Sequence, residues 1–167
     1  MSWSRLARRI AFAGLIAATG TLAGACSFTP VYSSTASKPV AALAYAKPAS
    51  RLEQIIYQDL ALRIGTTDAT TAPLAQVSVS QSAAVMTRTK SVGFATPYEL
   101  TVTATLVVTP RDGGAAKPQS FTRTATAEYT TTGQVLADNA AQADAGERAA
   151  RAAAESLRLA LLAASSR

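Results

Sequence analysis

Two stretches in which apolar and hydroxyl side chains alternate constrain the fold of this chain more than any other feature. Every second side chain in residues 98–108 is apolar or aromatic, and the same period of two recurs in 121–130. Side chains of a β-strand point alternately to its two faces, so both stretches predict strands with one core-facing side. Pro110 and the pair Gly113–Gly114 lie between them and favour a turn, which predicts an antiparallel hairpin. The other face of this hairpin carries mainly Thr, so one side of the sheet is expected to be uncovered or docked elsewhere.

Two helices are predicted outside the hairpin. The first spans about 50–64, where apolar residues recur at helical spacing. Ser50 and Glu53 form a capping box at its start, and Gly65 is well placed as its C-cap. The second spans about 138–164, where a stripe of Ala and Leu is flanked by Arg and Glu. A face of small residues suits close packing of that helix on a sheet.

Two further strands complete the predicted fold. A short apolar run at 40–46 predicts a first strand, and alternating Val and Ser predict another over about 74–87. The resulting order is strand, helix, three strands, helix. We therefore expect one α+β domain over residues 40–167, a two-layer sandwich whose four-stranded, mostly antiparallel sheet carries both helices packed on one face.

The first 25 residues have the pattern of a lipoprotein signal peptide. Three arginines precede an uncharged, apolar or small-residue segment at 10–24, which is shorter than the ~20 apolar residues that span a bilayer. Small residues then lead directly into Cys26, the only cysteine of the chain, as the lipoprotein signal peptidase requires. We expect residues 1–25 to be removed, Cys26 to be lipidated, and the Ser-, Thr- and Pro-rich segment 26–39 to be a tether.

Two alternatives to this interpretation remain open, namely an ordinary secretory signal peptide and an uncleaved anchor. The residue after the cysteine is Ser27 and not Asp, the residue that commonly retains lipoproteins in the inner membrane. The sequence therefore predicts a protein held by its lipid anchor on the periplasmic side of the outer membrane.

Composition excludes several classes of function. The chain has one cysteine and no histidine, which excludes an internal disulfide, cysteine-cluster and histidine zinc sites, and Ser-His-Asp or Cys-His catalysis. Three of its 16 basic residues lie in the first nine positions, and the remaining 13 against 10 acidic residues leave only +3. That charge is too small and too scattered to indicate nucleic-acid binding. We expect no enzyme, no metal and no cofactor, although composition alone leaves a Ser-Lys or carboxylate-pair mechanism possible.

Several segments together resemble the LptE family of lipopolysaccharide-assembly lipoproteins in its alphaproteobacterial form. The sharpest is Cys26-Ser-Phe-Thr-Pro-Val-Tyr32, close to the family's Cys-Gly-Phe-Thr-Pro-Leu-Tyr start. The capped helix around Ile56–Leu62, the strands at 98–108 and 123–129, and the Ala- and Arg-rich final helix add to it. The similarity extends over nearly the whole mature chain.

This resemblance implies a function that composition does not show. Proteins of this family plug the large outer-membrane β-barrel of the LptD type, aid its assembly, and help it to insert lipopolysaccharide into the outer leaflet. They are also described as binding lipopolysaccharide. Arg88 and Lys90 lie between the second and third predicted strands, where the family tends to place basic residues that meet lipopolysaccharide phosphates. The simpler interpretation of this pair is a solvated turn.

Two other functions are compatible with the sequence. An auxiliary lipoprotein of a lipid-trafficking ABC transporter has a similar size and order of elements. A periplasmic hydrolase is the less favoured candidate, because the chain has no histidine and no motif of an activated nucleophile.

We expect Cys26→Ser to abolish lipidation, because only a thiol accepts the diacylglycerol at this position. Metabolic labelling of cells with a clickable palmitate analogue measures this directly. Label retained on the Ser variant would exclude Cys26 as the lipidated residue.

Overall fold

The hairpin that the alternating stretches predict forms the centre of the sheet. In the computed structural model, which describes residues 42–86 and 95–165, β3 (Thr96–Thr109) pairs antiparallel with β4 (Gln119–Thr131). The turn between them includes Gly113, whose φ of 74° is a backbone conformation that glycine adopts without a steric cost. β2 (Leu74–Val85) pairs antiparallel with β3 over its whole length, from Leu74 opposite Thr109 to Val85 opposite Tyr98.

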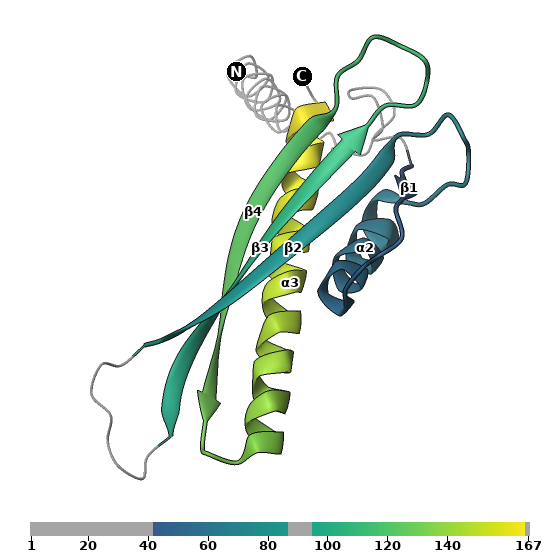
Figure 1. The fold of residues 1–167 in the computed structure, drawn as a ribbon. Helices are drawn as coiled ribbons and strands as arrows, with labels where there is room; N and C mark the ends of the chain where they lie inside the picture. Colours follow the sequence, from purple (N-terminus) through teal and green to yellow (C-terminus); the bar gives the residue numbers. More distant parts are fainter. Residues whose placement is uncertain (1–41, 87–94, 166–167) are drawn as a thin grey trace, which may run out of the picture. The chain divides into compact units, whose positions relative to one another are not determined.

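The first strand is shorter than the sequence predicts. Only β1 (Ala44–Tyr45) is extended, and it pairs parallel with the start of β2. The remainder of the predicted stretch that can be compared, Ala46, no longer belongs to the strand, and Pro48 follows two residues later, in the segment that leads to the first helix. The sheet therefore has the order β1-β2-β3-β4, and its β1 edge covers only the first residues of β2 (Figure 1).

The helix α2 (Arg51–Ile64) is capped as the sequence predicts. Ser50 precedes it in an extended conformation, and its hydroxyl accepts a hydrogen bond from the Glu53 N–H at 3.2 Å. The Glu53 carboxylate accepts the N–H of Ala49 at 2.6 Å, one residue earlier than a standard capping box. At the other end, Gly65 has a φ of 101° and donates its N–H to Ala61.

The helix α3 (Val135–Ser165) begins three residues earlier than predicted. Asp138 was expected at its start, but it lies in the first turn of the helix. Its carboxylate accepts hydrogen bonds from the N–H groups of Thr132 and Gly133, at 2.7 and 2.9 Å, and so closes the turn between β4 and α3. The Asp is a local terminus signal, but it stabilises the turn before the helix.

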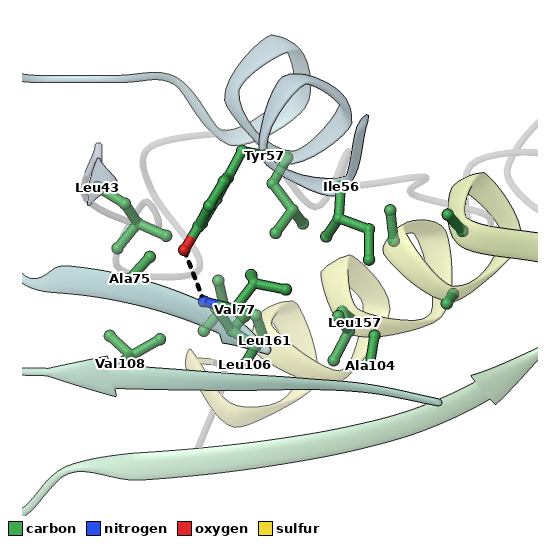
Figure 2. Packing of buried hydrophobic residues seen from close by; sticks show 14 residues of the cluster. Leu43, Ile56, Tyr57, Ala75, Val77, Ala104, Leu106, Val108, Leu157 and Leu161 are labelled. Carbon is green, nitrogen blue, oxygen red and sulfur yellow. Dashed lines mark hydrogen bonds between the residues drawn. The ribbon is translucent and has the colours of Figure 1, made fainter. Parts of the chain in front are cut away.

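Both helices cover the same face of the sheet, and the core lies between the two layers (Figure 1). α3 packs against β3 and β4, while α2 packs against β2 and against α3. Figure 2 shows the apolar side chains of both helices directed toward the buried side of the strands. The largest fully buried side chains come from every layer: Ile56, Leu60, Leu100, Val102, Leu106 and Leu157. The predicted α+β sandwich, with a four-stranded mostly antiparallel sheet and two helices on one face, is confirmed.

Two carboxylates of α3 fix the position of α2 along it. Glu147 bonds Arg51 of α2 at 2.8 Å and Arg151 of α3 at 3.1 Å. One turn or two further along, Glu155 lies 2.6 Å from Arg158 of α3 and 3.5 Å from Arg63 of α2. The hydrogen bond from Arg158 holds the pKa of Glu155 below its ordinary value, so this contact weakens only as the pH falls through that lowered pKa.

A buried tyrosine replaces the missing part of β1. Val77 is buried, and its N–H points to the side of β2 where β1 has already ended. The Tyr57 hydroxyl of α2 accepts this N–H at 2.8 Å, and the dashed line in Figure 2 marks the bond. Burial raises the pKa of Tyr57, which keeps the hydroxyl neutral. Without it, a buried donor would have no partner in the described part of the chain.

Tyr57→Phe should therefore destabilise the domain by about 1–3 kcal/mol, the cost of leaving a buried donor unpaired. Chemical denaturation followed by circular dichroism measures this. Tyr45→Phe is a matched control, since Tyr45 packs edge-on against Tyr57 and its hydroxyl makes only a 3.4 Å bond to Gly65. Equal losses of stability in the two variants would contradict the role of the Val77 bond.

Candidate interaction face

The side of the sheet opposite the two helices, called the outer face below, is covered by no other element of the described chain. Its residues alternate with the buried ones along β2, β3 and β4. The central part consists of three rows that run across the strands. These rows are Ser78-Thr105-Thr122, Ser80-Thr103-Thr124 and Ser82-Thr101-Thr126.

Every position in these three rows carries a hydroxyl. The hydroxyls of Thr103 and Thr124 lie 3.2 Å apart, and those of Thr105 and Thr122 lie 3.0 Å apart. Such cross-strand Thr pairs stabilise a sheet by roughly 0.2–1 kcal/mol each, and β-branched side chains suit an extended backbone. The side chains in these rows on β2 and β4 are exposed, so most of the hydroxyls are accessible to a partner.

The chemistry of the three rows is that of a neutral, hydrogen-bonding surface. A hydroxyl both donates and accepts, and it needs no counter-ion when a polar surface covers it. Within the described ranges, no three His, Cys, Asp or Glu side chains gather as they would around a metal ion. The arrangement is suited to contact with another polar surface over a wide area.

Charge appears at one end of the outer face. Glu99 on β3 lies directly opposite Glu128 on β4, next to the ends of β2 and β3 that flank residues 87–94. Like charges in directly opposed positions are unfavourable in a sheet. Arg148 of α3 donates to the backbone carbonyl of Glu128 at 2.8 Å.

The three residues predicted as sites lie outside the described residues. Cys26 belongs to the N-terminal segment, and Arg88 and Lys90 belong to the segment between β2 and β3. The structure therefore does not bring these residues together with any described side chain, and their roles stay predictions.

An aromatic and apolar group at the same end of the sheet was missed from the sequence. Tyr98 and Tyr129 stack with ring centroids 5.3 Å apart, on the helix side of the strands. Met86, Val135 and Leu136 are largely exposed nearby, at the ends of β2 and α3. The in-phase alternation of the two hairpin strands contained the signal for the tyrosine pair. The late predicted start of α3 concealed the two exposed residues of its first turn.

No helix among the described residues has the length and apolar character needed to cross a bilayer. A family model described as LptE, lipopolysaccharide-assembly, matches residues 38–161 of the chain. No curated protein sequence matches it.

Solved structures with the same fold include three bacterial proteins. Rare lipoprotein B of Shewanella oneidensis has a TM-score of 0.54 and 16% identity, over 74% of this chain and 93% of that one. A minor lipoprotein of Acinetobacter baumannii has a TM-score of 0.53 and 16% identity, over 74% and 90%. A protein of Caulobacter crescentus described as a candidate lipoprotein has a TM-score of 0.51 and 18% identity, over 75% and 91%. At these identities the similarity concerns the fold.

Proposed function

Because the chain belongs to the LptE family of lipopolysaccharide-assembly proteins, we propose that it is the outer-membrane lipoprotein that plugs an LptD-type β-barrel. In this role it aids assembly of the barrel and insertion of lipopolysaccharide into the outer leaflet. The lipidated residue is Cys26, and residues 26–39 link the anchor to the domain.

The observation that carries the proposal is the outer face. The helices of the domain pack on one side of the sheet, and the other side presents three rows of hydroxyls without a charge among them. The interior of a large outer-membrane barrel is lined by polar residues and water. A neutral hydroxyl surface exchanges hydrogen bonds with such a lining without the desolvation cost of burying a charge.

The test of this contact places charge in the middle row of the outer face. In Ser80→Lys with Thr124→Lys, both new ammonium groups replace exposed hydroxyls, so the fold should persist. Burial of the cations against the barrel is costly, and we expect at least a tenfold loss of barrel recovered by affinity purification of the lipoprotein. Circular dichroism checks the fold.

Ala152→Lys is the matched control, because Ala152 is exposed on α3, away from the sheet. Normal barrel recovery with the double variant would overturn the proposed contact. Recovery of inner-membrane ATPase or substrate-binding subunits in place of a barrel would favour the ABC-transporter alternative.

A second part of the proposal assigns Arg88 and Lys90 to the phosphates of lipopolysaccharide. Guanidinium and ammonium groups form charge-assisted hydrogen bonds with phosphate oxygens. The two residues are separated by one position in a segment bounded by Met86 on one side and Ala95 on the other. A solvated turn is the competing interpretation.

Arg88→Glu with Lys90→Glu should weaken lipopolysaccharide binding at least tenfold at low ionic strength, and less at high salt, because exposed charges are screened. Binding of labelled lipopolysaccharide to the purified protein measures this. Arg111→Glu with Lys117→Glu makes the same change of charge in the turn between β3 and β4, where both residues are exposed. Equal effects of the two pairs would leave only a nonspecific charge effect.

A further inference from the structure

The four-stranded sheet ends in two long edges that are protected to different degrees. β4 forms one edge along its whole length. The other edge belongs to β2 beyond Ala75, because β1 pairs only with Leu74 and Ala75. Free strand edges promote pairing with other chains, and proteins commonly block them with charged side chains or proline.

Arginines occupy the β4 edge. Arg123 donates to the carbonyl of Thr122 at 2.7 Å, and Arg148 of α3 donates to the carbonyl of Glu128 at 2.8 Å. Two backbone acceptors that face away from β3 are thus already occupied by charged side chains. An incoming strand would have to displace both.

The β2 edge has no such protection. The carbonyl of Ala75 and the N–H of Val77 point away from β3, toward Ala46 and Tyr57 respectively. Backbone direction alternates along a strand, so Val79, Gln81, Ala83 and Val85 present their N–H and C=O groups on the same side. This stretch, Val79–Val85, is called the distal edge below. No side chain of the described residues hydrogen-bonds to it.

The composition of the distal edge is that of a strand suited to pairing. Residues 74–86 include no charged residue, and their one strand has no proline. The side chains from Ser80 to Met86 are exposed, and Val85 and Met86 are 46% and 50% exposed although they are apolar. A second strand on this edge would lie in line with β1 and continue the sheet.

We propose that the distal edge binds the distal edge of a second copy of this chain. The wall of a closed barrel has no free edge to offer, whereas every copy of this chain has one of matching length. A two-fold axis at Ser82 makes the pairing antiparallel and places Gln81 opposite Ala83 of the other copy, and Val79 opposite Val85. Because the edge is uncharged, the two copies meet without repulsion, and their outer faces continue across the joint.

This inference does not depend on the proposed function, because the distal edge and the outer face are different surfaces. It accounts for the asymmetry of the two edges. The fold blocks the β4 edge with two arginines and leaves the β2 edge without charge, and pairing between copies buries the apolar end of the second.

A cysteine crosslink tests the pairing in the full chain. Ser82 opposite its own copy forms a non-hydrogen-bonded pair, with Cα atoms about 4.5 Å apart, within the range of a disulfide. Ser82→Cys should give a disulfide-linked product of twice the mass after oxidation of intact envelopes. Thr126→Cys lies in the same row at the β4 edge and should give no more of this product than the wild-type chain, which has only Cys26.

A second substitution in the Ser82→Cys chain shows whether the backbone edge is responsible. Ala83→Pro removes an outward N–H that is unbonded in the monomer, and should reduce the crosslinked product at least tenfold. Gln81→Lys keeps every N–H and places cations on both sides of the axis, and should have the same effect. Absence of a homodimer, equal crosslinking of Thr126→Cys, or a mixed product with another protein would overturn the proposal.

Discussion

The close packing of α3 on the sheet is the contact on which the rest of the domain depends. The buried stripe of α3 consists largely of alanines, and Ala145, Ala149, Ala150 and Ala153 have no exposed surface. Small side chains allow the helix backbone to approach β3 and β4, whose larger residues Leu100, Val102 and Leu106 fill the space between the layers. Gly146 extends the stripe and meets Leu52 of α2 and Gln81 of β2. The helix thus joins all three parts of the structure.

This packing has a consequence for the other side of the sheet. The apolar residues of the strands are buried under one layer of helices, so no apolar area remains on the outer face to require a second layer. The three hydroxyl rows are compatible with water and with a polar partner surface. A domain of this design presents a broad neutral surface while its core stays closed, as the proposed role within a barrel requires.

The short β1 has an equally specific consequence. Since it covers only two residues of β2, the structure needs another acceptor for the buried N–H of Val77, and Tyr57 provides it. Beyond Val77 the edge reaches solvent and no substitute is present among the described residues. Whether a strand edge is satisfied internally or remains available is therefore decided over a distance of a few residues.

Local patterns in the sequence determined the secondary structure of this protein and its fold class. Alternation in β3 and β4, the Ser50–Glu53 cap and Gly65 act between neighbours in the chain, so they can be recognised without a structure. Where a local signal had two possible uses, the prediction failed. Asp138 was assigned to the helix start but closes the preceding turn, and the apolar run at 40–46 supplied only two strand residues.

Tertiary structure alone decided which surfaces are free. The bond of Tyr57 to Val77 and that of Arg148 to Glu128 each join residues 20 positions apart, and Arg51 reaches Glu147 across 96 positions. No sequence period relates such partners, because their distance depends on how helices and strands pack. The sequence determined that one sheet face is polar. Only the packing determined that both helices leave this face open, that arginines occupy one edge, and that the other edge remains unpaired beyond β1, because these features depend on the positions of whole elements relative to one another.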